Sequence, residues 1–252
     1  MHELKLTHSP LHEMSISLEI ARPAGLDEIS IASFLNEKFG DTAEKRLLRR
    51  SSVTIGGKEG AVARDTGFGG GLAILKEKNA QVGFLVDRLV YTQKQPYSNW
   101  DDVVKGLRYY WKMYSSAFKI SKVEKVSVQC VNFLDLNDLG TCQFGDVISL
   151  VPPELSDLGS GVCVGFHYEE TLYYKQPDVF VSIDRFYRMR PDVERKDIRK
   201  LNPIRMDIRV FKDLVNFPDV PDVPDDVLVS LRKAKNAAFE NALTEAQLAR
   251  YR

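Results

Sequence analysis

The sequence predicts an α+β protein: one or more antiparallel sheets with long helices packed on one face, and two halves that look similar. Three observations support this class. Segments that alternate apolar and polar residues outnumber the helical ones, successive strands are spaced as hairpins, and a long amphipathic helix over 100–118 stands between strands. Each half offers strands, a hairpin and a long helix, although the halves do not align residue by residue.

The composition fits an ordinary globular protein with a sizeable core. The chain has 252 residues, 44% of them hydrophobic and 28% charged. Its 35 Lys and Arg residues balance 35 Asp and Glu, which removes the simplest argument for bulk binding to nucleic acid or to an anionic membrane. No apolar run approaches the roughly 20 residues that span a bilayer. We expect halves at 1–140 and 141–252, packed as one globular unit.

The first part of the chain predicts a strand, a helix and then an irregular region. Residues 14–20 alternate apolar and polar, as a half-buried strand does. Asp27 is placed to cap a helix that ends at Gly40. Residues 41–71 are less regular, and we expect a loop or a mobile edge there.

The glycine-rich run Gly67–Gly71 raises the question of an anion site, because glycines let backbone amides approach a phosphate. Its spacing fits neither the P-loop nor the dinucleotide fingerprint. Residues 72–76 also look like a strand, where both motifs require a helix. A flexible turn is the favoured interpretation, with anion binding as the open alternative.

The stretch 82–133 has the clearest pattern of the chain: strands, a break at 95–99, a helix and another strand. Apolar residues recur at three- and four-residue spacing from Trp100 to Phe118, and Ser98 or Asn99 can cap this helix. Residues 125–133 return as a strand. Such an aromatic stripe predicts core packing rather than a cofactor site.

The C-terminal part predicts mostly hairpin strands followed by helix. The expected elements are a short strand at 144–151, a hairpin of 162–174 with 179–186, a strand at 204–211 and a helical tail from about 222. Thr244 and Gln247 form a capping pattern that predicts a short last helix.

Several landmarks resemble a sporadically distributed family of uncharacterised bacterial and archaeal proteins of similar length. They are Pro10-Leu11-x-Glu13, Tyr97-x-x-Trp100, the strand ending at Asn132 and Phe239-Glu240-x-x-Leu243-Thr244. In that family the strand carries Arg-Tyr-Ile-Asn, whereas this chain has Gln129-Cys130-Val131-Asn132. The resemblance supports the α+β class and implies no particular activity.

Cysteine and histidine give weak signs of metal or nucleophilic chemistry. The three cysteines are odd in number and lack a CxxC pair, as expected of free thiols in a reducing cytoplasm. His8 and His12 have a metal-ligand separation only on a helix, which the Pro between them disfavours. Cys163 with His167 could form a nucleophile and base, but one strand-borne pair is little support.

Acidic side chains around the predicted hairpin could hold a metal or perform acid–base work. They are Glu169, Glu170, Asp178 and Asp184. Solvated strand faces are the simpler explanation.

The densest basic region, 185–209, supplies the candidate interaction surface. Its members are Arg185, Tyr187, Arg188, Arg190, Arg195 and Arg199. Such a patch could track phosphates and stack bases, although acidic residues mixed into it reduce the excess charge. Asn132 is the polar core position that we single out.

The leading expectation is a non-enzymatic cytoplasmic binding protein that acts with a protein partner, because no catalytic set converges in the sequence. We expect no cofactor, metal or membrane. The alternative is a nucleic-acid or nucleotide-binding protein that uses 185–209, in a defence or toxin–antitoxin system. A third hypothesis is an enzyme or metal protein of unknown reaction.

Overall fold

The computed structural model describes residues 9–55, 61–96, 99–134, 148, 165–188, 203–214 and 222–251. In this part, nine strands form one sheet in the order β2-β3-β4-β5-β1-β6-β9-β8-β7. The strands are β1 (Leu11–Glu19), β2 (Glu44–Ile55), β3 (Ala61–Leu75), β4 (Ala80–Leu85), β5 (Arg88–Lys94), β6 (Lys125–Leu134), β7 (Gly165–Tyr174), β8 (Val179–Arg188) and β9 (Ile204–Asp213). The α+β class and the antiparallel sheet are thus confirmed.

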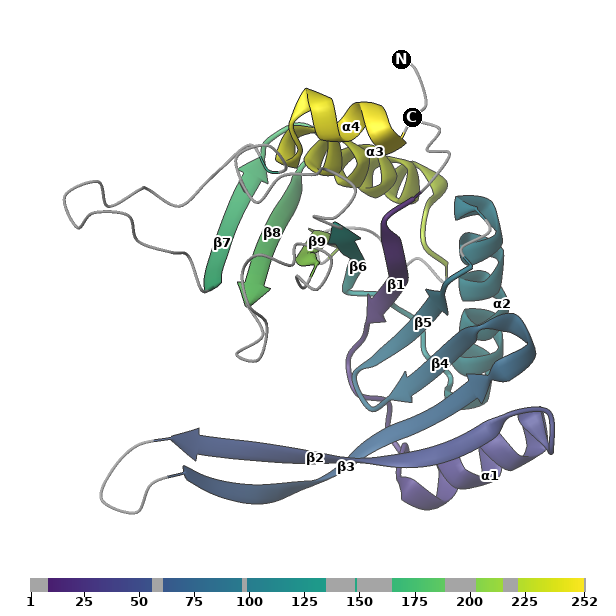
Figure 1. The fold of residues 1–252 in the computed structure, drawn as a ribbon. Helices are drawn as coiled ribbons and strands as arrows, with labels where there is room; N and C mark the ends of the chain where they lie inside the picture. The colour runs from purple at the N-terminus through teal and green to yellow at the C-terminus, as the bar shows by residue number, and fades with distance from the viewer. Residues whose placement is uncertain are drawn as a thin grey trace. The chain divides into compact units, whose positions relative to one another are not determined.

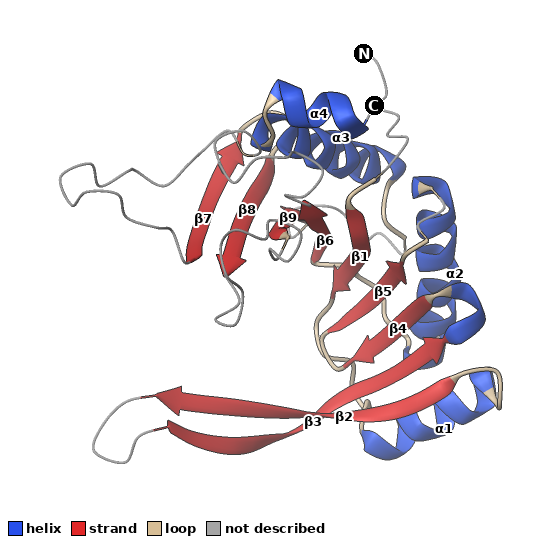
Figure 2. Ribbon diagram, viewed as in Figure 1, coloured by secondary structure: helices blue, strands red, loops and turns tan. Residues whose placement is uncertain are grey.

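The described helices are few, and the sheet dominates the fold (Figure 2). They are α1 (Glu28–Phe39), α2 (Trp100–Phe118), α3 (Asp225–Ala242), α4 (Glu245–Tyr251) and the 3-10 helix η1 (Lys76–Lys78). The expectation of long helices is therefore not confirmed.

The chain forms two compact units that interleave along the sequence. The middle unit comprises Ser15–Val126 and Asp213–Pro224, and the terminal unit comprises Met1–Met14, Ser127–Lys212 and Asp225–Arg252. Both β1 and β6 contribute residues to each unit. The boundary expected at residue 140 lies outside the described residues.

The first helix of the middle unit begins and ends as its sequence predicts. The Asp27 side chain accepts a hydrogen bond from the Ser30 backbone N–H at 2.8 Å, and the Ser30 hydroxyl accepts one from the Asp27 N–H at 3.0 Å. These two bonds satisfy donors that a helix start leaves open. Gly40 ends α1 with a φ of +48°, a conformation that favours glycine.

Helices α1 and α2 pack on the same face of β4 in the middle unit (Figure 1). The buried Phe84 ring lies 5.0 Å from the Phe34 ring of α1 and 5.4 Å from the Tyr114 ring of α2, measured between centroids. Most of the predicted stripe of α2 is core: Trp100, Val103, Leu107, Trp111 and Tyr114 are buried, as is Tyr110, whereas Val104 and Phe118 are half-buried. Asn99 caps this helix by accepting a bond from the Asp102 N–H at 2.9 Å.

Residues 44–55 and 61–71 correct the expectation of a loop over 41–71, whereas the expected edge position agrees with β2, the first strand in the sheet order. They form β2 and most of β3, a hairpin paired from Glu44↔Ile74 to Ile55↔Ala61. Only Gly70–Leu75 of β3 pairs with β4, so the remainder continues as a two-stranded ribbon (Figure 1). Two register shifts, at Leu48/Arg49 and Arg50/Ser51, break the alternation by which a strand is recognised in sequence.

The Gly67–Gly71 run lies inside β3, so the expectation of a flexible turn is also wrong. Its glycines let other parts of the unit come close. A Cβ on Gly70 would overlap the carbonyl oxygen of Phe84, and one on Gly71 would lie 2.6 Å from the Ile31 side chain of α1. Close packing thus explains these two glycines without an anion.

The terminal unit contains the predicted hairpin of β7 and β8, followed by β9. The register runs from Gly165↔Arg188 to Tyr174↔Val179. Alternate β8 residues from Val179 to Tyr187 are buried, and α3 packs against this strand. The predicted cap of α4 is confirmed, since the Gln247 N–H donates to the Thr244 hydroxyl at 3.3 Å.

The short strand expected at 144–151 lies outside the described residues except for Ile148. That residue is buried and forms an isolated antiparallel bridge with Leu243.

Candidate interaction surface

The structure places the predicted basic surface differently from the sequence analysis. Arg185 and Tyr187 are only 2% and 3% exposed, so neither contributes to a surface. The cause is the two-residue period of β8, which directs both side chains to the same face as Val181 and Ile183. The side chain of Arg188 and all of Arg190, Arg195 and Arg199 lie outside the described residues.

Arg185 is a buried ion-pair partner. Its Nη1 donates to Oε1 of Glu170 on β7 at 2.8 Å, and the Glu170 side chain is 30% exposed. The Arg185 Nε is buried and has no hydrogen-bond partner among the described residues. The positive charge of this buried guanidinium is therefore balanced by one carboxylate, that of Glu170.

Asn132 is buried within the terminal unit. Its Nδ2 donates to the backbone oxygen of Met206 on β9 at 3.1 Å. The neighbouring Cys130 is also buried, which raises the pKa of its thiol, and the charge of Asp207 acts in the same direction, against the charge of Lys235. A raised pKa leaves this thiol protonated and poorly nucleophilic.

The acidic residues of the hairpin do not converge on one point. Glu170 faces Arg185, whereas Glu169 and Asp184 stand opposite each other on the other face of the hairpin. Asp178 lies in the turn and accepts a bond from the Tyr173 hydroxyl at 3.0 Å. Within the described part of the chain, no group of three His, Cys, Asp or Glu residues is placed to hold a metal.

The other predicted pairs cannot be placed, since His8 and Cys163 lie outside the described residues. His167 is described, and its Nε2 lies 2.8 Å from Oδ1 of Asp184 across the hairpin.

Exposed hydrophobic side chains gather on the hairpin of β7 and β8. Five of the ten large exposed hydrophobic residues in the described part lie there: Tyr168, Leu172, Tyr173, Tyr174 and Phe186. We call the four on β7, Tyr168, Leu172, Tyr173 and Tyr174, the aromatic edge. The aromatic edge was not predicted, although its signal is present in the sequence: β7, GFHYEETLYY, has large apolar residues at both odd and even positions near its end.

The aromatic edge borders the face of the hairpin and β9 that no described helix covers. We call this the open face; it comprises His167, Glu169, Thr171, Tyr173, Phe180, Ser182, Asp184, Phe186, Arg205, Asp207, Arg209 and Phe211. The Phe180 ring stacks on Phe211 with centroids 4.9 Å apart, and Tyr173 lies 4.8 Å from Phe180. None of these residues is in the buried class.

The charges of the open face are mixed. Arg205 donates to Asp207 through two bonds of 2.9 and 2.6 Å, so these two charges compensate each other. Arg209 lies over the Phe211 ring at 5.7 Å. Among the described residues of this face, Glu169 and Asp184 add two carboxylates close to these groups, which disfavours a polyanion there.

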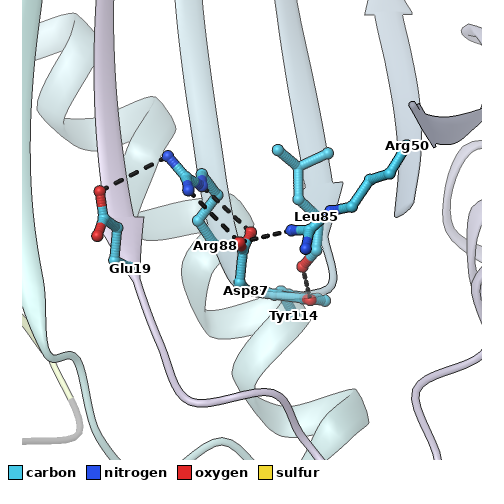
Figure 3. Close-up of polar contacts among 6 residues, drawn as sticks. All are labelled: Glu19, Arg50, Leu85, Asp87, Arg88 and Tyr114. Carbon is cyan, nitrogen blue, oxygen red and sulfur yellow. Dashed lines mark hydrogen bonds and ion pairs between the residues drawn. The ribbon is translucent and has the colours of Figure 1, made fainter. Parts of the chain in front are cut away.

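A second polar cluster lies in the middle unit around the turn between β4 and β5 (Figure 3). Asp87 accepts hydrogen bonds from Arg50 and Arg88, and Arg88 Nη1 lies 3.6 Å from Oε1 of Glu19. The Tyr114 hydroxyl donates to the Leu85 carbonyl at 2.6 Å. These contacts join β1, β2, the turn and α2.

The pKa shifts of Asp87 and Tyr114 do not suit acid–base catalysis near neutral pH. Burial alone would raise the pKa of Asp87, but the hydrogen bonds and charges of Arg88 and Arg50 outweigh it and lower the pKa. Burial, assisted by the charge of Asp87, raises the pKa of Tyr114. Asp87 thus stays ionised and Tyr114 stays neutral near pH 7, so neither is poised to exchange a proton. The cluster is best explained as structural.

The middle unit also has a small cavity of about 220 Å³ among α1, η1 and α2. Its wall includes Phe39, Tyr110, Lys38, Lys78 and Glu77. Ligand pockets usually measure about 300–1,000 Å³. The small volume and mixed charge make this cavity a weaker candidate than the aromatic edge.

A scan against protein-family models finds no match to this chain, and a search of curated proteins finds no similar sequence. Among the described helices, none combines the length and the apolar character needed to cross a membrane.

Proposed function

We propose that the protein works by binding a polypeptide partner on the β7–β8 hairpin, without catalysis of its own. The observation that carries this proposal is the aromatic edge, where large apolar side chains on both faces of one strand are exposed. Clusters of this kind on a folded protein are typical of interaction sites, whereas single exposed apolar residues are not. A cytoplasmic location belongs to the same proposal and rests on the cysteine pattern.

The negative charges of the open face favour a polypeptide partner over a nucleic acid. The Phe180 and Phe211 rings on the open face could stack with bases, and Arg209 could contact phosphate. The carboxylates Glu169 and Asp184 lie on the same face, however, and would repel a phosphate backbone. The nucleic-acid hypothesis for 185–209 also loses Arg185, which is buried.

A photo-crosslinking experiment tests the proposal. p-Benzoylphenylalanine is introduced at Tyr174 of the aromatic edge, and at Tyr109, an exposed tyrosine of α2, as the matched control. We expect a discrete adduct in irradiated cells at position 174 only. The adduct should be digested by protease and not by nuclease, and Leu172→Lys should abolish it.

Two results would overturn the proposal. A nuclease-sensitive adduct at position 174 would favour the nucleic-acid alternative. Adducts of equal yield at positions 109 and 174, or none at either, would remove the special status of the aromatic edge.

A further inference from the structure

We propose that β7 binds its partner by strand addition: an extended polypeptide segment pairs along the edge of β7 that faces no described strand and places a basic side chain against Glu169. The inference rests on the proposed function and specifies its mode and the chemistry of the partner.

The backbone of β7 is suited to pairing. It is the last strand of the sheet and pairs with β8 alone among the described strands. In an antiparallel pair, alternate residues direct their N–H and C=O groups away from the neighbour, where a further strand can bond them. The strand has 10 residues, its register with β8 has no shift, and it lacks the Pro and Lys that commonly protect an edge.

The side chains of β7 show what the added strand would cover. Tyr168 stands opposite the buried Arg185, and Leu172 stands opposite the buried Val181. Tyr168 and Leu172 both remain exposed, although the β8 residues opposite them on the same face are buried. A strand on the other side of β7 would give these side chains a second neighbour, so its residues on this face should be apolar.

The charge on the other face selects a basic partner. Glu169 is exposed, and it has no basic partner in the described part of the chain. The residue opposite it on β8 is another carboxylate, Asp184. Asp184 itself lies against His167, and Asp207 is bound by Arg205. A Lys or Arg directly across from Glu169 on an added strand would supply the missing opposite charge.

The same charge argues against a second copy of β7 as the occupant. Self-pairing would bring the adjacent Glu169 and Glu170 of both copies into one short stretch of ladder. Like charges facing or diagonal to each other weaken strand pairing. A basic segment of another polypeptide avoids this repulsion.

A displayed library of random twelve-residue peptides, panned against the full-length protein, provides the test. We expect enriched peptides with alternating apolar residues and a Lys or Arg between them. Glu169→Lys should shift the enrichment at that place to Asp or Glu and weaken the original peptides about fivefold. Glu37→Lys, a charge reversal on the exposed side of α1, should leave the enrichment unchanged.

Several outcomes would overturn the inference. These are enrichment without basic residues, enrichment that is indifferent to Glu169→Lys, and a failure to enrich any peptide. A concentration-dependent dimer in sedimentation velocity that Leu172→Lys abolishes would show self-pairing instead. If the library fails while the protease-sensitive adduct at position 174 persists, the partner binds in another mode and the proposed function stands.

Discussion

Asp87 is the residue on which the polar cluster of the middle unit depends, since it accepts bonds from both Arg50 and Arg88 (Figure 3). Asp87→Asn removes the charge and keeps the size. We expect it to lower the free energy of unfolding at pH 7 by about 0.5–1 kcal/mol, the range for partly exposed ion pairs. Urea unfolding followed by circular dichroism measures this change.

The pH dependence of the Asp87 effect has a defined sign. Its arginine partners hold the pKa of the folded carboxyl below its ordinary value. The contribution is therefore present above the unfolded pKa, about 4, and is lost as the pH falls towards the folded value. The gap between wild type and Asp87→Asn should shrink from pH 7 to pH 3. Asp41→Asn, on an exposed turn, is the control, and a gap that persists unchanged at pH 3 would contradict the assignment.

The pair of Arg185 and Glu170 makes a second residue-scale prediction. Glu170→Leu leaves the buried guanidinium without its carboxylate, and we expect a loss of about 2–3 kcal/mol in unfolding free energy, reduced from a fully buried pair because Glu170 is partly exposed. The double variant Glu170→Leu with Arg185→Met should recover most of that loss, because no buried charge remains. A denaturant double-mutant cycle in which the double variant is no better than the single one would refute this account.

At the scale of elements, the glycines of β3 are tested by small side chains. Gly70 has a φ of +135° and an added Cβ would overlap the Phe84 carbonyl oxygen, so Gly70→Ala should cost about 3 kcal/mol or more. Gly83→Ala on β4 is the matched control, since an added Cβ there meets nothing closer than 3.8 Å and should change stability by less than about 1 kcal/mol. Thermal unfolding of the two variants should separate them clearly; equal melting temperatures would contradict the packing explanation.

Elements with local determinants were predictable, and those set by distant contacts were not. Helix α2 carries its own cap at Asn99 and its own apolar stripe, and both appear in the sequence as they do in the structure. In β3 the deciding facts are contacts with Phe84 and Ile31, which are distant in sequence. Glycines that accommodate such neighbours look like a turn when only the sequence is read.

The aromatic edge was missed for a related reason. In β8 a basic residue at an odd position, Arg185, suggested a surface, but it shares a face with Val181 and Ile183, and all three are buried. The exposure of Leu172 and Tyr174 follows from the place of β7 at the end of the sheet, which is set by strand order. Strand order depends on the whole molecule, and a pattern within one strand does not report it.

At the scale of the whole molecule, the interleaved units predict how fragments behave. A fragment 15–126 contains nearly all of the middle unit, whereas a fragment 1–140, cut at the boundary expected from the sequence, carries all of β6 without its neighbour β9. Val128, Cys130 and Leu134 of β6 are buried in the full chain and would lose their cover.

Fragment 1–140 should therefore bind more of the hydrophobic dye ANS per molecule than fragment 15–126, and it should aggregate at lower concentration. In full-length protein, where β9 and α3 are present, dye binding should fall to the lower level. Fluorescence titration and light scattering measure both effects. Equal dye binding by the two fragments would mean that the apolar residues of β6 are buried even when residues 203–251 are missing. This result would contradict the division into two interleaved units.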